Sequence, residues 1–484
     1  MKEKRIMSLR DRVRERFADK RIAVIGIGVS NLPLIRFLLD AGASVCARDI
    51  KPLDQLSPEV KTLCEERGLS VICGEGYLDG IEEEIIFRSP GLRPDTPAIA
   101  EAVDAGAELT SEMELFFALT PARIVAITGS DGKTTTTTLT YLLTKKLLEC
   151  SGEGGCAYVG GNIGAPLLPF VYDMTEKDIA VVELSSFQLQ SMTDAPDIAV
   201  ITNITPNHLN WHTGMEEYTE AKKNIYRGAR CRRLVSNLDN AATREILGQE
   251  LDGIRRIAFS RAEQSCDTAE GMLYLDHDNV ILREGVCETV LLDTAKIKLP
   301  GTHNIENYMA AAGAVYGLGF DDEDFVRVLR ETAADFGGVE HRLEFVRTLD
   351  GVDYYNSSID SSPTRTAAAL RAFSDRSIVI CGGYDKHIPF EPLAEVLCEK
   401  ASFVVLCGAT AEAIREALEA HPSFADSGVG YVVEGDFVRA VERAREAAGE
   451  GERVVLSPAC ASFDMFRNFE ERGRRFKEIV NSLK

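Results

Sequence analysis

Three segments of this chain share one pattern, in which a short apolar run leads into glycine and a helical stretch follows. They span residues 21–28 (RIAVIGIG), 123–129 (RIVAITG) and 377–383 (SIVICGG). Short β-rich runs that alternate with helices are typical of βαβ units on mostly parallel sheets. The pattern therefore predicts the α/β fold class, with such units in three separate regions of the chain.

The spacing of further apolar and turn-rich segments predicts the organisation of the chain. Buried strands are expected at residues 179–184, 198–202, 403–408 and 453–457. Helices are expected at residues 33–41, 134–148, 304–318 and 463–483. The length of 484 residues corresponds to about three domains. Turn-rich joints place these domains at residues 1–119, 120–337 and 338–484.

Charge and composition exclude several classes of protein. The chain has 54 Lys and Arg against 76 Asp and Glu, a net charge of −22, which argues against nucleic-acid binding. It still allows an anionic substrate, because a local pocket can oppose the global sign. No run of 18 apolar residues predicts a membrane span. A charged N-terminal segment and 12 scattered cysteines without a CxxC pair predict a reduced, cytoplasmic protein.

The segment TGSDGKTT, residues 128–135, lies between a predicted strand and a predicted helix. Glycines let backbone N–H groups turn toward a phosphate, and a helix N-terminus adds its positive end. Lys133 is then expected on the terminal phosphates, with the Thr134 hydroxyl facing magnesium. The GxxGKT spacing is two residues shorter than the common phosphate loop. The alternative is an ordinary glycine-rich turn with a helix-capping threonine.

Two further side chains follow predicted strands. Glu183 ends the strand at 179–184, where open α/β sheets bind ligands, and its carboxylate suits Mg²⁺. His208 follows the strand at 198–202 and lies four residues before His212, so a zinc pair is conceivable. No third zinc ligand is nearby. The alternatives are a solvent-facing acid and a structural histidine.

The N-terminal turn GIGVSN, residues 26–31, is a variant of the dinucleotide fingerprint, with Asn31 in the place of its third glycine. Asp49 lies close to the spacing of the ribose-binding acid of that fingerprint. A nucleotide-type ligand is therefore plausible here. The reading as an NAD-dependent dehydrogenase leaves the phosphate loop and Glu183 unexplained.

A set of longer motifs accompanies these features in a fixed order. They are GSDGKTTT (129–136), GGNIG (160–164), ELSSFQL (183–189), NHLNWH (207–212), YTEAKKNIY (218–226), GTHNIEN (301–307), HR (341–342), SSPTRT (361–366), GGYDKHIPF (382–390) and SPACASFDMFRNFEERG (457–473). Together they resemble the Mur ligases, ATP-dependent enzymes that add amino acids to peptidoglycan precursors. The resemblance covers residues 18–483.

The resemblance implies three α/β domains: a Rossmann-like N-terminal domain that binds UDP, a central P-loop-type domain that binds ATP, and a Rossmann-like C-terminal domain that brings the amino acid. The match is closest to members that add D-glutamate to UDP-N-acetylmuramoyl-L-alanine through an acyl phosphate. ATP and two Mg²⁺ ions are the implied cofactors. A cytoplasmic monomer that binds no nucleic acid is expected.

The resemblance also assigns roles to residues. Lys133, Glu183, His208 and Lys222 are implied as catalytic, with Lys222 reacting with CO₂ to give a carbamate. The implied metal ligands are Thr134, Glu183, His208 and the carbamylated Lys222. The implied ATP-binding residues are Gly129, Ser130, Asp131, Gly132, Lys133, Thr134, Thr135, Asn162, Asn304, Asn307 and Arg342. The implied substrate-binding residues are Gly28, Val29, Ser30, Asp49, Ile50, Ser89 and Gly91 for UDP, and Lys386, Ser462 and Phe469 for D-glutamate.

This sequence departs from the family pattern at four positions. Asn207 and Asn210 stand where many relatives carry Asp, which changes the charge beside His208. Ser357 stands where the family often has an Asp near the nucleotide, and Ile359 where some members have a lysine. The pocket details there stay open.

Two rival functions remain. Sister ligases with another acceptor amino acid, and folylpolyglutamate synthases, share the central motifs. A nucleotide-sugar sensor that keeps the fold without turnover is the other, and intact Lys133, Glu183, His208 and Lys222 argue against it.

Overall fold

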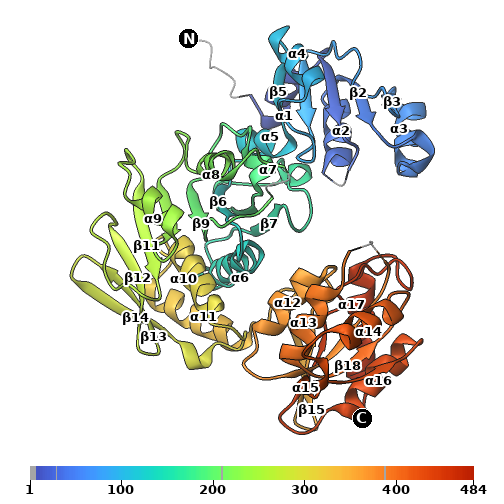
Figure 1. The fold of residues 1–484 in the computed structure, drawn as a ribbon. Coiled ribbons are helices and arrows are strands. Elements are labelled where there is room, and N and C mark those ends of the chain that lie inside the picture. Colours follow the sequence, from blue (N-terminus) through green and yellow to red (C-terminus); the bar gives the residue numbers. More distant parts are fainter. Residues whose placement is uncertain (1–6, 29, 209–210, 386–387) are drawn as a thin grey trace, which may run out of the picture. The chain divides into compact units, whose positions relative to one another are not determined.

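The computed structural model describes residues 7–28, 30–208, 211–385 and 388–484 (Figure 1). The chain divides into two compact units. The first unit comprises Met1–Lys296 and Ile305–Thr332, and the second comprises Ile297–Asn304 and Ala333–Lys484. The first unit contains two open sheets and the second contains one.

The first sheet is fully parallel, with the order β3-β2-β1-β4-β5. Its strands are β1 (Arg21–Ile25), β2 (Ser44–Asp49), β3 (Ser70–Cys73), β4 (Ile85–Arg88) and β5 (Glu108–Thr110), and its helices are α1 (Leu9–Phe17), α2 (Asn31–Asp40), α3 (Pro58–Arg67), α4 (Pro97–Asp104) and α5 (Glu112–Leu119). The chain leaves β1 toward β2 and later returns to β4 on the other side. Sheets of this kind bind ligands at such a switch point, beyond the carboxyl ends of β1 and β4.

The continuous apolar runs of the sequence arise because both faces of these sheets are buried. In β1, Ile22 and Val24 join one apolar cluster, and Ala23 and Ile25 join another. Successive side chains of a strand point to opposite faces, so a strand covered on both sides has no polar alternation.

The second sheet has nine strands in the order β14-β13-β12-β11-β10-β9-β6-β8-β7. Strands β6 to β12 pair in parallel, whereas β13 and β14 add two antiparallel strands at one edge. The strands are β6 (Arg123–Thr128), β7 (Ala157–Gly161), β8 (Ile179–Glu183), β9 (Ile198–Ile201), β10 (Arg233–Asn237), β11 (Arg255–Ser260), β12 (Gly271–Asp276), β13 (Asn279–Glu284) and β14 (Cys287–Asp293). The helices are α6 (Lys133–Ser151), α7 (Ser186–Leu189), α8 (Met215–Lys223), α9 (Ala241–Leu247), α10 (His303–Val315) and α11 (Asp322–Asp335).

The third sheet lies in the second unit and has the order β15-β16-β20-β17-β18-β19, with only the β15–β16 pair antiparallel. Its strands are β15 (Glu344–Leu349), β16 (Val352–Asn356), β17 (Ser377–Cys381), β18 (Ala401–Leu406), β19 (Gly430–Val433) and β20 (Arg453–Leu456). The helices are α12 (Pro363–Arg371), α13 (Glu391–Lys400), α14 (Ala411–Ala420), α15 (Phe424–Ser427), α16 (Phe437–Ala447) and α17 (Phe469–Ser482).

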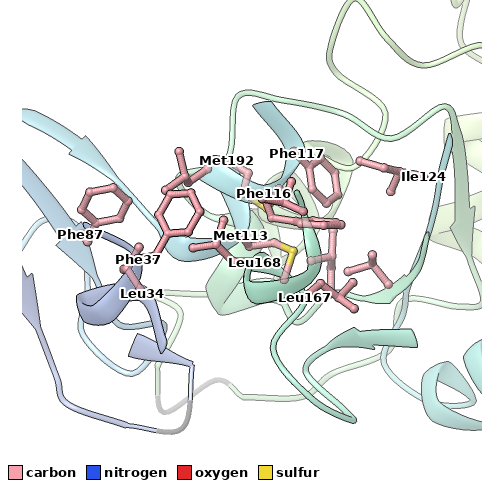
Figure 2. Packing of buried hydrophobic residues seen from close by; sticks show 14 of the residues in the cluster. Leu34, Phe37, Phe87, Met113, Phe116, Phe117, Ile124, Leu167, Leu168 and Met192 are labelled. Carbon is pink, nitrogen blue, oxygen red and sulfur yellow. The ribbon is translucent and has the colours of Figure 1, made fainter. Parts of the chain in front are cut away.

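One apolar cluster runs from the first sheet into the second (Figure 2). Phe37 of α2 stacks on Tyr172 with ring centroids 5.3 Å apart. Helix α5 contributes Phe116 and Phe117, and the one-turn helix η2 (Leu168–Phe170) contributes Leu168. The first two sheets therefore share a continuous hydrophobic core.

Helix α6 forms although its first turns are rich in threonine, a weak helix former. The hydroxyls of Thr138 and Thr140 donate to the carbonyls one turn back, at Thr134 and Thr136, with distances of 2.8 and 2.7 Å. Such bonds satisfy the hydroxyls within the helix. The following leucines are buried, so packing stabilises the helix.

Most elements predicted from the sequence are confirmed. Strands β8, β9, β18 and β20 match the predicted runs within about two residues. The helix predicted at 463–483 begins too early, because α17 starts only at Phe469, where the Asn468 side chain caps it by accepting from Glu471 N. In the part of the chain that the structure describes, every helix is too short or too polar to cross a bilayer.

Candidate active site

The phosphate-loop segment joins the end of β6 to the start of α6. Gly132 precedes the helix with φ 77°, a left-handed conformation that glycine adopts without strain. A side chain at Gly129 would collide with Thr202, and one at Gly132 would collide with Asn307. Both glycines are therefore required by the close approach of neighbouring elements. Thr134 and Thr135 lie in the first turn of α6.

The loop is held in place by the segment that follows β9. Ser130 N donates to Asn203 O at 2.9 Å, and Asp131 N donates to Asn203 Oδ1 at 2.9 Å. The Ser130 hydroxyl donates to Thr205 O at 2.9 Å. The segment after β9 thus fixes the position of the loop. Lys133 Nζ donates to Gly129 O and Ser130 O, each at 2.9 Å.

Lys222 of α8 reaches the same loop from the other side. Its side chain is buried, and Nζ donates to Gly129 O at 2.7 Å and to Thr128 Oγ1 at 3.3 Å. Burial, and then the charge of Lys133, hold the pKa of Lys222 well below its usual range. Two amines therefore share one carbonyl oxygen, that of Gly129.

Glu183 ends β8, next to β6 in the sheet, and its side chain is 1% exposed. Asn162 Nδ2 donates to Glu183 Oε1 at 2.8 Å. The other oxygen, Oε2, is buried with no hydrogen-bond partner among the described residues. A buried carboxylate oxygen without a donor suits a cation, so the chemistry of Glu183 fits Mg²⁺.

The two histidines of NHLNWH have different surroundings. His208 has φ 54° and packs against Phe187 with ring centroids 4.9 Å apart. His212 is buried, its Nε2 lies 3.0 Å from Ser186 Oγ, and burial lowers its pKa. Over the described ranges, no three His, Cys, Asp or Glu side chains gather into a metal-binding group. The predicted zinc pair therefore finds no third ligand there.

The predicted nucleotide residues fall into both units. Asn307 of α10 accepts from Thr136 Oγ1 at 3.2 Å, which ties α10 to α6 within the first unit. Asn304 and Arg342 belong to the second unit. Asn304 Nδ2 donates to Pro300 O at 2.5 Å, and Arg342 N donates to Val339 O at 2.9 Å.

The N-terminal turn lies at the switch point of the first sheet, between β1 and α2. Asn31 donates to Gly26 O at 2.8 Å and so closes the turn where a dinucleotide fingerprint has glycine. Both carboxylate oxygens of Asp49 accept backbone N–H groups, from Ile27 at 2.6 Å and from Lys51 at 2.9 Å. Asp49 therefore stabilises the turn through hydrogen bonds to the backbone.

The other predicted UDP residues lie at the same edge of the sheet or next to it. Ser89 Oγ accepts from Gly91 N at 3.3 Å just after β4. Ser30 precedes α2, and the Ile50 side chain is exposed after β2. Gly28 lies within the turn itself, and Val29 lies outside the described residues.

The predicted amino-acid residues lie in the second unit. Ser462 is buried, and Phe469 opens α17 with its ring 6.0 Å from that of His341. Arg472 of α17, which sequence reasoning missed, donates to Cys460 O at 3.0 Å and Ala461 O at 3.1 Å and so fixes the loop that leads to Ser462. Lys386 lies outside the described residues.

Three of the four positions that depart from the family pattern make local hydrogen bonds in the structure. Asn207 Oδ1 accepts from His208 N at 2.9 Å, and Asn210 lies outside the described residues. Ser357 Oγ accepts from Leu343 N at 3.1 Å, and Ile359 N donates to His341 O at 3.1 Å.

A carboxylate is present close to Ser357. Asp360 is buried, and Ser457 Oγ donates to it at 2.8 Å. Burial raises the pKa of Asp360, which hydrogen bonds from Ser357 and Ser457 partly offset.

Sequence reasoning also missed Tyr218. Its hydroxyl lies 2.9 Å from Ser130 Oγ, and Lys222 Nζ lies 4.7 Å from the centre of its ring. The spacing of four residues between Tyr218 and Lys222 was a usable signal, since it puts both side chains on one face of α8.

A phosphate-type loop on a mostly parallel sheet, in a chain that contains two further open α/β sheets, defines a class of multidomain nucleotide-binding α/β proteins. Three family domains match this chain: the Mur ligase MurD-like N-terminal domain at residues 20–111, the Mur ligase middle domain at 127–315, and the Mur ligase glutamate ligase domain at 341–460. The chain belongs to the Mur ligase family.

Curated relatives match nearly the whole chain. A protein of Acetivibrio thermocellus named UDP-N-acetylmuramoylalanine–D-glutamate ligase is 45% identical over 479 residues, which cover 97% of this chain and 98% of the relative. A protein of Clostridium novyi with the same name is 46% identical, over 96% of this chain and 97% of the relative.

Solved structures share the fold. One of a UDP-N-acetylmuramoyl-L-alanyl-D-glutamate–2,6-diaminopimelate ligase has a TM-score of 0.54 at 19% identity, covering 84% of this chain and 94% of that one. One of a pseudomurein peptide ligase type C from Methanothermus fervidus has a TM-score of 0.50 at 19% identity, covering 96% and 100%.

Proposed function

We propose that this protein joins D-glutamate to UDP-N-acetylmuramoyl-L-alanine with ATP, in the synthesis of peptidoglycan precursors. The observation that carries the acceptor is the 45% identity, over nearly the full chain, to relatives named for this reaction. The rest of the proposal, the residues that carry out the reaction, is argued from the geometry of the first unit.

The ATP phosphates are proposed to bind at the loop from Gly129 to Thr135, with Lys133 as their cation. Three features support this: the loop's backbone is fixed by Asn203, it opens α6, and it lies at the carboxyl end of β6. Asn162, Asn304, Asn307 and Arg342 are proposed to contact the nucleotide.

Two Mg²⁺ ions are proposed, one held by Thr134 and Glu183 together with ATP oxygens and the second by His208, with the carbamylated Lys222 as a further metal ligand. When bound, the metal would offset the negative charge of the phosphates. The partnerless Oε2 of Glu183 supports this assignment, and Asn162 orients the same carboxylate through Oε1.

Lys222 is proposed to react with CO₂. Carbamate formation needs a neutral amine, which attacks the carbon of CO₂ and then loses a proton. Burial and the neighbouring Lys133 favour the neutral form of Lys222, as its lowered pKa indicates. The product is an anion beside Lys133, which would attract the Lys133 cation, whereas a protonated Lys222 would be repelled by it.

The reaction is proposed to proceed in two steps. The carboxylate of the nucleotide-sugar substrate attacks the γ-phosphorus of ATP and releases ADP, leaving an acyl phosphate. The amine of D-glutamate then attacks the acyl carbon and expels phosphate. Because two anions meet in the first step, Lys133 contributes by lowering their repulsion, and no nucleophilic side chain is needed.

The remaining sites are proposed by position. Gly28, Val29, Ser30, Asp49, Ile50, Ser89 and Gly91 are proposed to form the UDP site, and Lys386, Ser462 and Phe469 the D-glutamate site. Domains at residues 1–119, 120–337 and 338–484 are proposed, and each matched family domain falls inside one of them. The protein is proposed to act as a monomer.

The test is phosphate release from ATP with UDP-N-acetylmuramoyl-L-alanine, Mg²⁺ and a panel of amino acids. Release that requires D-glutamate, with L-glutamate and L-alanine inactive, is expected. Release with a different amino acid would reassign the acceptor and keep the mechanism. No release with any amino acid would overturn the proposed function.

A further inference from the structure

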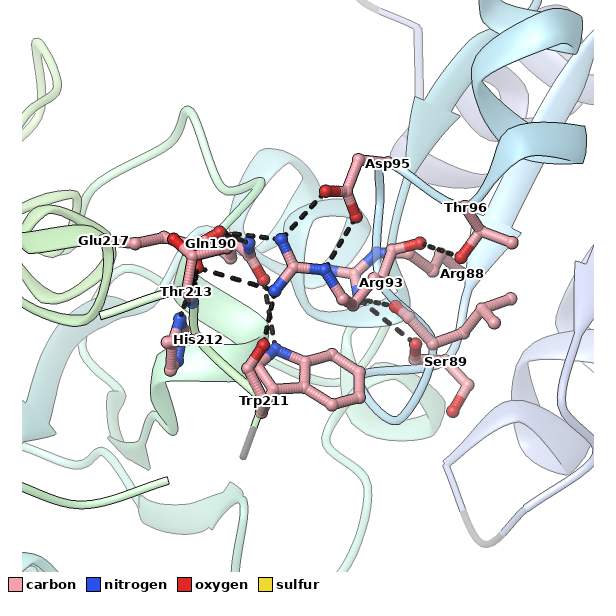
Figure 3. A network of polar contacts seen from close by, with 11 residues as sticks. Arg88, Ser89, Arg93, Asp95, Thr96, Gln190, Trp211, His212, Thr213 and Glu217 are labelled. Atoms are coloured by element: carbon pink, nitrogen blue, oxygen red, sulfur yellow. Dashed lines mark hydrogen bonds and ion pairs between the residues drawn. The ribbon is translucent and has the colours of Figure 1, made fainter. Parts of the chain in front are cut away.

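Arg93 connects the loop after β4 to the second sheet's elements (Figure 3). Its guanidinium donates to Glu217 Oε1 of α8 at 2.8 Å and to Trp211 O at 2.5 Å. On its own loop it forms a double hydrogen bond with Asp95, with both distances 2.8 Å. A planar guanidinium bonded on two sides in this way fixes direction as well as distance.

The carboxylate of Glu217 is likewise held by several hydrogen bonds. It accepts from Arg93, from Gln190 Nε2 at 2.8 Å and from Thr213 N at 2.5 Å. The hydrogen bond from Arg93, the largest cause, and those from Thr213 lower the pKa of Glu217 to about 2. Arg93 is 24% exposed and Glu217 is 25% exposed, so the ion pair is largely shielded from water. It is therefore less screened by solvent than a fully exposed surface pair.

Helix α8 transmits this contact to the phosphate loop. Next to Glu217, Tyr218 reaches Ser130 Oγ at 2.9 Å, and one turn further Lys222 reaches Gly129 O at 2.7 Å. The same short helix is thus bonded to the loop after β4 at its start and to the phosphate loop at its end. The loop after β4 begins with Ser89 and Gly91, which belong to the proposed UDP site.

We propose that Arg93 and Glu217 are positioning residues, which hold the nucleotide-sugar site at a fixed distance from the ATP phosphates. The proposal rests on the proposed function, because only there must the two substrates meet. Neither side chain is proposed to touch a reacting atom. They act through α8 and through the loop after β4.

This role predicts a specific kinetic pattern. Displacing one substrate by about 1 Å from the other can cost a hundredfold in rate, even where each substrate still binds. Arg93→Ala and Glu217→Ala are each expected to lower kcat by about tenfold to a hundredfold, with the KM for ATP changed by less than about threefold. Because the two residues act as a unit, the double variant is expected to be no worse than either single one.

The experiment compares both single variants, the double variant and Arg93→Lys in the phosphate-release assay. Active sites are counted by ATP binding, so that a loss of folded protein does not pass for a loss of kcat. Arg93→Lys keeps the positive charge but lacks the planar guanidinium with its several N–H donors. Its kcat is expected to lie between those of Arg93→Ala and the wild type. Arg36→Ala serves as the matched control, because Arg36 pairs with Glu59 at 2.7 Å on the surface of the same unit.

A second readout does not depend on turnover. Trp211 is the chain's single tryptophan, and its carbonyl accepts from Arg93. Arg93→Ala and Glu217→Ala are expected to shift its emission and increase quenching by acrylamide, whereas Arg36→Ala is not.

Unchanged kcat per active site, or losses that add in the double variant, would overturn the positioning role. If the wild type is active only with another amino acid, the assay is run with that amino acid. The kcat values of the variants then test the positioning role in the same way. If the wild type is inactive with every amino acid, the proposed function fails by itself. Unchanged Trp211 emission in both single variants would then overturn the inferred connection, and a shift in both would support it.

Discussion

Replacing Glu112 by glutamine should stabilise the first unit at pH 8 and much less at pH 5. Glu112 opens α5 and is 6% exposed, and its Oε1 has no hydrogen-bond partner among the described residues. Burial raises its pKa from 4.5 to about 7, against a partial lowering by the backbone of Leu168. The folded protein therefore binds this proton more tightly than the unfolded chain does.

The size of the effect follows from the two pKa values. Between pH 4.5 and about 7 the folded state holds more protons than the unfolded state, so the free energy of unfolding falls as pH rises. At about 1.4 kcal/mol for each pH unit between the two values, the raised pKa of Glu112 lowers the free energy of unfolding by about 3 kcal/mol at pH 8 and about 1 kcal/mol at pH 5. Glutamine stays neutral and removes this cost, while any cost of burying its amide is the same at both pH values.

The assay is urea unfolding followed by the emission of Trp211, which lies in the same unit as Glu112. Glu114, whose pKa burial also raises to about 7, is present in both proteins and cancels in their difference. Glu101→Gln, at an exposed position of α4, is the control and should have no pH-dependent effect. A Glu112→Gln difference that is equal at pH 5 and pH 8 would refute the reasoning.

Three further predictions concern the proposed ATP site, each measured by phosphate release. Lys222→Ala should lower activity by about a hundredfold or more, and a small carboxylic acid should partly restore it; wild-type turnover would remove the carbamate assignment. Lys133→Ala should abolish formation of the acyl phosphate, and unchanged ATP turnover would remove Lys133 from the phosphate site. Asn162→Ala should raise the Mg²⁺ concentration for half-maximal activity by about tenfold, because it leaves Glu183 unoriented; an unchanged requirement would contradict this role.

Local patterns in the sequence correctly predicted the order of strands, loops and helices and the residues at the ends of strands. The strand, glycine and helix order around Lys133 appears in the structure as β6, the loop and α6. Glu183 lies at the end of β8, as the apolar run before it indicated. The predicted start of α17 was wrong because the helix begins after the capping residue Asn468, and not where the apolar pattern begins.

Long-range partners could not be predicted in this way. Arg93 and Glu217 are 124 residues apart, and no spacing rule joins them. Asp49 has the position of a ribose-binding acid, and no spacing rule indicated that its two oxygens also accept from Ile27 and Lys51. Which of several nearby donors a carboxylate meets depends on packing between elements that are distant in the sequence.

The continuous core of the first two sheets limits how this chain can be divided. A cut after residue 119 would leave Phe116 and Phe117 without Leu167 and Leu168 and would expose apolar surface on both fragments. Isolated N-terminal fragments should therefore aggregate more readily than their length suggests. Chimaeras between relatives should exchange the two sheets as one block, because the two halves of this core pack against each other.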